Sequence, residues 1–479
     1  MTTPLDIIVL AAGKGTRMKS RLPKVLQRLA GRPMLGHVLD AAAQLGARRC
    51  VVVTGHGAQE VQAFCAEWHA QASQRAGEAG ATSAMQCLTA LQQPQLGTGH
   101  AAQQALPLLD DGGITLILSG DVPLIQPATL GALAQACGGR RLALLTIDFE
   151  DPTGYGRVIR SGESVQAIVE QKDATPAQLA VRECYSGIMA APTALLRRLL
   201  PLLSSNNAQQ EFYLTDVVRH AVAAGEAVTA LKTADAAQVA GVNSPAQLAA
   251  LEREAQRRMA DALMAQGVRL ADPARLDVRG TLECGQDVEI DIGCLFEGHV
   301  SLGDGVRIGA HCVIANACIE AGARIHPFTH IDGDAPQGVR VGAGALIGPY
   351  ARLRPGAQLG ADVHIGNFVE VKNSTLAPGA KANHLAYLGD ATVGERVNYG
   401  AGSITANYDG ARKHRTTIGA DVHVGSNCVL VAPVTLGAGG TVAAGSVITQ
   451  DTAPGALAIA RGRQSSLPGW QRPAKPSKG

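Results

Sequence analysis

The sequence predicts an α/β chain with two differently built parts: a parallel sheet covered by helices, followed by a parallel β-helix. Short apolar runs that alternate with helical patterns indicate the first part. Aliphatic residues that recur at every sixth position indicate the second part. An aromatic content of only 3%, together with 56 glycines, suits a solenoid of aliphatic stacks and small corner residues.

Four short apolar runs in the first half are typical of strands that are buried on both faces. They lie at residues 7–10, 51–54, 114–118 and 143–147. Helical patterns separate them, for example at 38–45 and 127–136. This alternation predicts a Rossmann-like, mostly parallel sheet with helices on both sides. Ligands of such sheets bind outside the carboxyl ends of the strands.

One amphipathic helix is expected at residues 244–266, as a linker between the two halves. Ser244 can cap this helix, and Pro245 fits its first turn. Its apolar stripe would consist of Leu248, Leu251, Ala255, Met259, Ala262 and Leu263. We therefore expect a first domain at 1–243, the linker at 244–266, a β-helix at 267–460 and a C-terminal arm at 461–479.

Three series of aliphatic residues carry the six-residue period of the second half. They are Ile290, Phe296, Leu302, Ile308 and Ile314; Val341, Ile347, Leu353, Leu359, Ile365 and Val371; and Ile418, Val424, Leu430, Leu436, Val442 and Ile448. Such a period is neither helical nor a two-residue alternation, and it predicts hexapeptide repeats that each send one side chain inward. The period breaks between Val393 and Ile418, where an excursion should leave the prism.

Composition excludes several classes of protein. A net charge of +2 gives no overall bias toward nucleic acid. The ten cysteines have no paired spacing, which favours idle thiols in a reducing compartment. No stretch is long and apolar enough to span a membrane, and the run at 7–10 lacks the basic flank of a signal peptide. We expect a cytoplasmic protein that acts on small molecules, with no nucleic-acid partner and no membrane insertion.

A glycine-rich segment at residues 10–18 follows the first strand. Its backbone amides could approach a phosphate, and Lys14, Arg17 and Lys24 could add positive charge. The spacing does not match a P-loop, and Met18 stands where a dinucleotide fingerprint needs its third glycine. Taken alone, the segment could equally be an ordinary turn.

A carboxylate, Asp121, follows the predicted strand at 114–118. It should lie at the carboxyl edge of the sheet, where it could hold Mg²⁺ on a triphosphate. The alternative is that Asp121 only caps a helix.

A second group of polar residues lies inside the repeats. Arg354 and Lys372 stand where the repeat usually has a small residue, which suggests a phosphate or carboxylate ligand. His384 could accept a proton from an amine that attacks an acyl group. A lone histidine more often packs or faces solvent, but the nearby Tyr387 and Asn398 favour the functional interpretation.

Both groups, in this order and joined by a long helix, resemble one bacterial enzyme family. The segments at 10–18, 95–100, 120–124, 152–157 and 169–174 are similar to sugar-phosphate nucleotidyltransferases. Together with 348–356, 367–372, 381–390 and 398–410, they resemble the bifunctional glucosamine-1-phosphate N-acetyltransferases and N-acetylglucosamine-1-phosphate uridyltransferases. The resemblance covers nearly the whole chain. It implies a left-handed β-helix and a homotrimer with acetyl-transfer sites between subunits.

The resemblance also implies roles for individual residues. For the nucleotide and sugar of the uridyltransferase half, the matching positions are Leu10, Ala11, Ala12, Gly13, Lys24, Gln92, Gly97, Thr98, Ser119, Gly120, Asp121, Gly156, Glu170, Tyr185 and Asn243. Lys24 and Arg17 would act in catalysis, and Asp121 and Asn243 would hold Mg²⁺. In the acetyltransferase half, His384 would be the catalytic base. The amino-sugar phosphate would contact Arg354, Lys372, Tyr387 and Asn398, and acetyl-CoA would contact Ala401, Asn407, Tyr408, Ser426, Ala444 and Arg461.

The implied reactions are acetylation of glucosamine 1-phosphate by acetyl-CoA, followed by uridyl transfer from UTP. The product, UDP-N-acetylglucosamine, would feed peptidoglycan and lipopolysaccharide synthesis. The alternatives are a single-activity nucleotidyltransferase whose β-helix only oligomerises, and a scaffold whose sites have decayed.

The chain departs from the family pattern at three places. Tyr185 replaces a common Asn, Ser119 replaces a common Tyr, and the polar segment at 69–84 is longer than expected.

Overall fold

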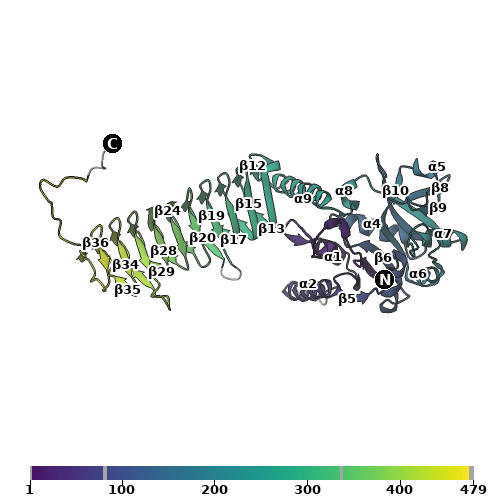
Figure 1. Ribbon diagram of the computed structural model, residues 1–479, viewed down its shortest axis with the longest axis horizontal. Helices are drawn as coiled ribbons and strands as arrows, with labels where there is room; N and C mark the ends of the chain where they lie inside the picture. Colours follow the sequence, from purple (N-terminus) through teal and green to yellow (C-terminus); the bar gives the residue numbers. More distant parts are fainter. Residues whose placement is uncertain (1–2, 79–83, 335–337, 474–479) are drawn as a thin grey trace, which may run out of the picture. The chain divides into compact units, whose positions relative to one another are not determined.

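The computed structural model describes residues 3–78, 84–334 and 338–473. The chain forms two compact units, Met1–Ala255 and Gln256–Gly479. Figure 1 colours both units by sequence. The boundary lies inside one helix, α9 (Pro245–Ala265).

A mixed nine-stranded sheet forms the centre of the first unit. Its main path runs β11 (Val228–Lys232), β7 (Leu142–Asp148), β10 (Glu183–Pro192), β6 (Ile114–Ser119), β1 (Leu5–Leu10), β4 (Arg49–Thr54) and β5 (Gln86–Leu91), with β8 (Arg157–Ser161) and β9 (Ser164–Val169) beside β10. All four predicted strands are confirmed as β1, β4, β6 and β7, and they are buried on both faces as expected. β10 is antiparallel to its two neighbours, β6 and β7, so the sheet is mostly but not wholly parallel.

Helices bury the two faces of this sheet in two apolar clusters. One cluster includes residues of α1 (Met34–Ala43), α2 (Ala58–Glu78) and α4 (Pro127–Cys137). The other includes residues of α3 (Thr98–Ala105), α6 (Thr193–Leu199) and α7 (Asp216–Ala223). α5 (Pro176–Leu179) and α8 (Ala236–Val239) are single turns.

The second unit is a parallel β-helix whose coils stack along the prism (Figure 1). One sheet contains β12 (Arg269–Leu270), β14 (Glu289–Ile290), β16 (Arg307–Ile308), β18 (Arg324–Ile325), β21 (Leu346–Ile347), β24 (His364–Asn367), β27 (Lys381–His384), β30 (Asn398–Tyr399), β33 (His423–Val424), β36 (Thr441–Val442) and β38 (Leu457–Ala458). We call it the first sheet of the prism.

The remaining strands form a sixteen-stranded sheet, which we call the second sheet. It contains β13 (Leu276–Cys284), β15 (Cys294–Leu302), β17 (Val313–Ile319), β19 (His330–Asp332), β20 (Val339–Val341), β22 (Arg352–Leu353), β23 (Gln358–Leu359), β25 (Glu370–Lys372), β26 (Thr375–Leu376), β28 (Tyr387–Gly389), β29 (Ala391–Val393), β31 (Ile404–Ala406), β32 (Thr416–Ile418), β34 (Val429–Val431), β35 (Val434–Leu436) and β37 (Val447–Ile448). The left-handedness implied by the resemblance stays a prediction.

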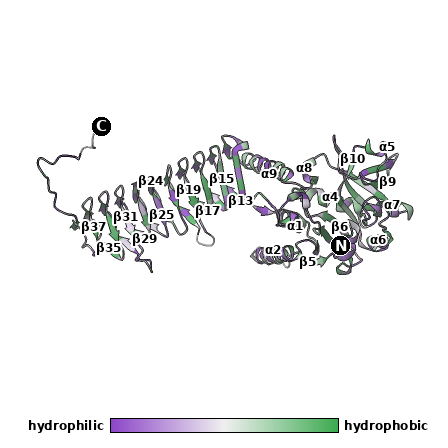
Figure 2. Cartoon of the chain, viewed as in Figure 1, coloured by the Kyte–Doolittle hydropathy of each residue, from purple (hydrophilic) through white to green (hydrophobic). Residues whose placement is uncertain are grey.

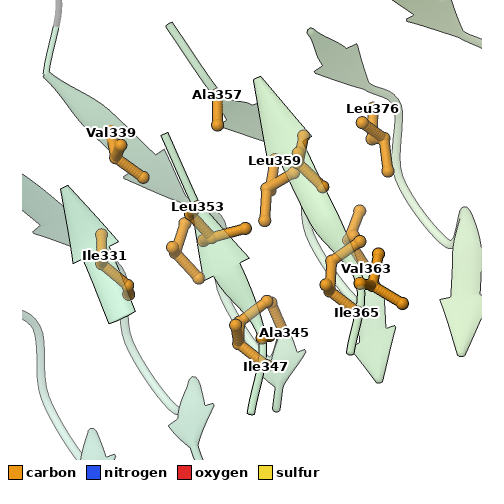
Figure 3. Close-up of a cluster of buried hydrophobic side chains, with 14 of the residues drawn as sticks. Ile331, Val339, Ala345, Ile347, Leu353, Ala357, Leu359, Val363, Ile365 and Leu376 are labelled. Atoms are coloured by element: carbon orange, nitrogen blue, oxygen red, sulfur yellow. The ribbon is translucent and has the colours of Figure 1, made fainter. Parts of the chain in front are cut away.

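The six-residue series is confirmed as the core of this unit. Every member of the three series is buried, none more than 4% exposed. In Figure 3, Ile347, Leu353, Leu359 and Ile365 lie among other buried aliphatic side chains. Hydrophobic residues, green in Figure 2, are interleaved with hydrophilic ones along these strands. Because each short strand buries only one or two residues, the core depends on stacking between coils.

The predicted excursion is real but shorter than expected. Tyr399 and Thr405 continue the buried series beyond Val393, so the break does not begin there. Within the described residues 393–418, the chain leaves the prism between β31 and β32, where Tyr408 and Lys413 form an antiparallel bridge. The prediction was too wide because Thr405, a polar residue, hid the period: its buried hydroxyl is satisfied by the backbone of Gly389.

Helix α9 confirms the predicted linker helix, and the amide of Gln247 donates to Ser244 Oγ at its start (3.3 Å). Leu251, Ala255 and Leu263 are buried as predicted, but Ala262 is exposed. Gln256, which the predicted stripe did not include, is buried. Its side chain accepts from Val278 N and donates to Val278 O, so a polar residue can enter the core at no hydrogen-bond cost.

Several smaller expectations can also be compared with the fold. All ten cysteines are free, and seven of them are buried. Within the described ranges, no helix has the length and apolarity needed to cross a membrane. Residues 69–78 of the long polar segment belong to α2, while 79–83 lie outside the described residues. Described residues beyond Arg461 contain no strand and are exposed.

Candidate active sites

A cavity of about 760 Å³ opens at the carboxyl ends of β1 and β6. It is lined by the glycine-rich segment 10–17 and by the predicted residues Lys24, Gln92, Gly97, Thr98, Ser119 and Asp121. An adjoining cavity of about 330 Å³ shares Leu10, Arg17, Thr98, Ser119 and Asp121. The smaller cavity adds Gly156, Glu170, Tyr185 and Asn243. The fold thus brings the predicted nucleotide and sugar residues together at one edge of the sheet, where α/β sheets bind ligands.

Lys24 marks the position of a cation between these cavities. Its ammonium donates to Asp121 Oδ2 and, over 3.2 Å, to Asn243 Oδ1. The predicted metal ligands therefore face one point, although Asp121 and Asn243 come from distant parts of the chain. Hard oxygens of this kind suit Mg²⁺, which usually takes one or two protein ligands and completes its shell with phosphate and water. The described residues contain no cluster of three His, Cys, Asp or Glu side chains that could hold a metal alone.

The predicted nucleotide-binding residues Gln92, Gly97 and Thr98 are held by hydrogen bonds to the backbone. Gln92 is buried, and its Nε2 donates to Gly97 O over 2.9 Å. Gly97 has φ +106°, and a Cβ there would lie 2.7 Å from Phe212 O, so only glycine fits. The next residue, Thr98, accepts from Leu214 N through its hydroxyl (3.0 Å). These bonds fix Gln92 and Thr98 in the cavity wall.

Glu170 is the acidic side chain of the smaller cavity. Burial raises the pKa of its carboxyl, and the hydrogen bond from Thr215 Oγ1 (3.0 Å) opposes that shift. One carboxylate oxygen is thus occupied by Thr215, and the other can accept a hydrogen bond from a sugar hydroxyl or amide.

Tyr185, which stands where the family pattern commonly has Asn, is buried beside the smaller cavity. Its ring belongs to the apolar cluster beside α7, and its buried hydroxyl has no hydrogen-bond partner among the described residues. Burial raises the pKa of this hydroxyl well above its usual value. Tyr185 lines the smaller cavity. Its hydroxyl, which would have to make the predicted contact with the sugar, is buried.

Replacing Tyr185 by phenylalanine should therefore raise stability. An unpaired buried hydroxyl costs about 1–3 kcal/mol, which Phe avoids while keeping the ring. We expect the first unit to gain about 1 kcal/mol, or about 2–4 °C in its thermal midpoint, with an unchanged KM for the sugar phosphate. Calorimetry and uridyl-transfer kinetics check this. A raised KM would mean that the hydroxyl reaches the sugar, and a lower midpoint would mean that it has a partner in the protein.

In the second unit, Asn367 orients His384. The two residues lie opposite each other on β24 and β27, 17 positions apart, and Asn367 Oδ1 is 3.0 Å from His384 Nδ1. An amide oxygen can only accept, so Nδ1 carries the proton and Nε2 is left free to take one. His384 itself is exposed. The sequence offered no signal for Asn367 as a partner, because only the coil length places it beside His384.

Cations gather on the neighbouring face of the prism. Arg354 donates to Glu370 (2.8 Å), which lies opposite Tyr387 on the next coil. The ammonium of Lys413 lowers the pKa of Lys372, with smaller contributions from desolvation and Arg354. Lys413 was missed from the sequence. It belongs to the excursion, whose run of basic residues from Arg412 to Arg415 was the available signal.

The predicted amino-sugar residues do not all share one face. Arg354, Lys372 and Tyr387 are on or next to strands of the second sheet, whereas Asn398 begins β30 of the first sheet. His384 ends β27, just before the corner that separates the two sheets. In a single chain, the four predicted amino-sugar residues therefore lie on two different faces of the prism.

The predicted acetyl-CoA residues follow one corner of successive coils. The backbone of Ala401 accepts from Asn427, that of Ser426 from Gly445, and that of Ala444 from the side chain of Arg461 (2.7 Å). Asn407 is buried and donates to Asp390, while Tyr408 is exposed in the excursion.

Comparison with known proteins finds a different family model for each of the two units. Residues 7–222 match the model of the MobA-like NTP transferase domain. Residues 338–373 and 415–450 match the bacterial transferase hexapeptide model of six repeats. The Bifunctional protein GlmU of a Polaromonas species is 68% identical over 100% of both chains. The chain belongs to the GlmU family.

Other GlmU proteins are similar over the same span. That of Albidiferax ferrireducens is 66% identical over 98% of this chain and 100% of its own. That of Aromatoleum aromaticum is 54% identical over 99% and 100%. As a GlmU family member, the chain is a bifunctional transferase in UDP-N-acetylglucosamine synthesis, with uridyltransferase and acetyltransferase activities. Of the alternatives, the single-activity nucleotidyltransferase is thereby disfavoured.

Proposed function

We propose that uridyl transfer takes place in the joined cavities of the first unit. UTP would lie in the larger cavity against the segment 10–17, with uracil near Gln92, Gly97 and Thr98. N-acetylglucosamine 1-phosphate would lie in the smaller cavity near Gly156 and Glu170. One observation carries this assignment: side-chain oxygens of Asp121 and Asn243 face the same point, and Asp121 lines both cavities.

Positioning and charge neutralisation are the main tasks of the protein in this reaction. We propose that Asp121 and Asn243 hold Mg²⁺, which when bound would offset the charge on the triphosphate. Lys24 would then turn its ammonium toward a phosphate oxygen, since the ammonium now occupies the cation position. Arg17, which borders both cavities, would add positive charge near the reacting phosphates.

We propose that His384 is the base of acetyl transfer. The amine of glucosamine 1-phosphate attacks the thioester carbonyl of acetyl-CoA, the carbon–sulfur bond breaks so that CoA leaves as its thiolate, and Nε2 takes the proton that the nitrogen sheds. Arg354, Lys372 and Tyr387 would hold the sugar phosphate, with Lys413 as a further cation. Asn398 would complete this site, and Ala401, Asn407, Tyr408, Ser426, Ala444 and Arg461 would bind acetyl-CoA.

A trimer is supported by an apolar ladder at the corner beside His384. We define the corner ladder as His311, Phe328, Tyr350, Phe368 and Leu385. The four ring-bearing residues stack face to face at centroid distances of 5.1–5.4 Å, and Phe328, Tyr350, Phe368 and Leu385 are about half exposed or more. Continuous exposed apolar surface of this kind marks an interface.

A second copy is the occupant that fits the corner ladder. The ladder lies between the two faces that divide the amino-sugar residues, so packing copies along it would bring Asn398 of one near Arg354 and Tyr387 of another. We therefore propose a homotrimer with acetyl sites between subunits. A cytoplasmic location is supported by the proposed co-substrates, acetyl-CoA and UTP, and by the free thiols, which are typical of a reducing compartment.

Replacing Phe368 by glutamate should dissociate the trimer. A charge in the middle of the corner ladder removes an aromatic anchor, which costs about 2 kcal/mol or more at each interface. Acetyl transfer should fall more than tenfold, while uridyl transfer should persist. Light scattering and both assays check this, with Thr435→Glu on another exposed strand as the control. A Phe368→Glu protein that remained trimeric would contradict the assigned interface.

The complete function is tested by supplying glucosamine 1-phosphate, acetyl-CoA, UTP and Mg²⁺ to the purified protein. UDP-N-acetylglucosamine is the expected product. Formation of N-acetylglucosamine 1-phosphate alone, or failure to acetylate, would show which half of the proposal is wrong.

A further inference from the structure

The two oxygens of the Asp121 carboxylate have different hydrogen-bond partners, and one of these partners is the hydroxyl of Ser119. Ser119 ends β6, and its Oγ donates to Asp121 Oδ1 over 2.6 Å. The other oxygen, Oδ2, accepts from the ammonium of Lys24, which also reaches Asn243 Oδ1. One carboxylate oxygen therefore has a serine partner, and the other faces the cation position.

This arrangement restricts a side chain that is otherwise free to turn. The terminal torsion of an aspartate has broad preferences, so an unrestrained carboxylate could present either oxygen. Lys24 cannot impose the orientation, because its ammonium is a point charge on a flexible stem. Ser119 can, because its hydroxyl hangs from the end of a central strand only two residues away.

The connection between the two residues is stiff. At Gly120, a Cβ would lie 3.2 Å from Val25 Cγ1 and 3.3 Å from Leu10 O, so the turn is packed against the neighbouring strand. The amide of Gly120 donates to Leu10 O (3.0 Å), which ties the turn to β1. Asp121 is 9% exposed. Because the backbone at Ser119 is fixed, its hydroxyl holds the carboxylate of Asp121 in one orientation.

We propose that Ser119 is a positioning residue, which orients Asp121 so that its Oδ2 and Asn243 Oδ1 face a single divalent cation. The inference rests on the proposed role of Asp121 and Asn243 as metal ligands. A tyrosine at this position, common in similar enzymes, carries its hydroxyl at the far end of a ring and could not make this bond. In this chain the hydroxyl of Ser119 would thus hold the metal-binding carboxylate.

Loss of the Ser119 hydroxyl should weaken cation binding. Removing the hydrogen-bond partner of a ligating carboxylate typically lowers metal affinity 10–100-fold. Since Asp121 is one of several ligands, with phosphate oxygens supplying others, we expect the lower end of that range, about tenfold.

Mn²⁺ titrations of the full-length protein, followed by electron paramagnetic resonance with UTP present and no sugar phosphate, test this without turnover. Ser119→Ala should raise the Mn²⁺ dissociation constant about tenfold, and Ser119→Thr, which keeps a hydroxyl on Cβ, should restore it. Thr115→Val is the matched control, since it removes a side-chain hydrogen bond to Thr193 (2.8 Å) from the same strand. That variant should bind Mn²⁺ normally.

Four other results would contradict either the role of Ser119 or the metal site itself. Unchanged Mn²⁺ binding in Ser119→Ala, together with weakened binding in Asp121→Asn, would show that Ser119 only stabilises the turn. Equal loss in the Ala and Thr variants would show that the serine shape, not the hydroxyl bond, matters. Weakened UTP binding without metal would make Ser119 a direct nucleotide ligand. Absence of Mn²⁺ binding by the unchanged protein would instead overturn the proposed metal site.

Discussion

Replacing His384 by alanine is expected to lower the rate of acetyl transfer about 10²–10⁴-fold, while uridyl transfer stays close to that of the unchanged protein. The attacking amine must lose a proton as the amide forms, and Nε2 of His384 is the acceptor that the bond to Asn367 leaves free. His384 is exposed, so its removal should not disturb the core. Steady-state kinetics of the two half-reactions, measured separately, check this result.

The Asn367→Ala protein provides a graded comparison. It keeps the imidazole but removes the bond that selects its tautomer, so the maximal rate of acetyl transfer should fall by less than in His384→Ala. A near-normal maximal rate with a raised KM in His384→Ala would show that the ring only binds substrate. Loss of both activities would point to misfolding.

Replacing Asp121 by asparagine is expected to have the opposite selectivity. Uridyl transfer should fall about 100-fold or more, since the charged protein ligand of the proposed Mg²⁺ supports several kcal/mol of charge stabilisation. Asparagine keeps the shape of the side chain, so folding and acetyl transfer should be retained. The rate should be measured over a range of Mg²⁺ concentrations, where partial recovery at high Mg²⁺ is expected.

Asp110→Asn is the matched control for that experiment. Asp110 is an exposed carboxylate paired with Arg49, outside both cavities. Its replacement should leave both activities and the Mg²⁺ dependence unchanged. If Asp121→Asn behaved like Asp110→Asn, Asp121 would not hold the metal.

Local patterns predicted the elements of this fold well because each depends on neighbouring residues. The strand at 114–118 is a continuous apolar run, and it became β6 because a strand covered on both faces needs no alternation. The antiparallel β10 was not foreseen, since strand order depends on how distant segments pair. Gln256 was missed for a similar reason: it is buried only because the backbone of Val278 satisfies its amide.

The sequence by itself determined the β-helix, the linker helix and the chemical character of both candidate sites. A six-residue period can be buried only by stacking coils, and the motif residues carry their chemistry wherever they lie. Only the tertiary structure decided which groups meet. Lys24 reaches Asp121 and Asn243, 97 and 219 positions away, because the sheet brings three segments to one edge.

The same distinction holds in the second unit. His384 and Asn367 are partners because the coil between them spans 17 residues, whereas the coil between Arg279 and Glu297 spans 18. The pairing of parallel strands in successive coils sets this register. Lys413 approaches Lys372 only because the excursion folds back beside the prism. Periodicity fixes which residues point inward, whereas long-range pairing fixes which polar groups come within hydrogen-bond distance.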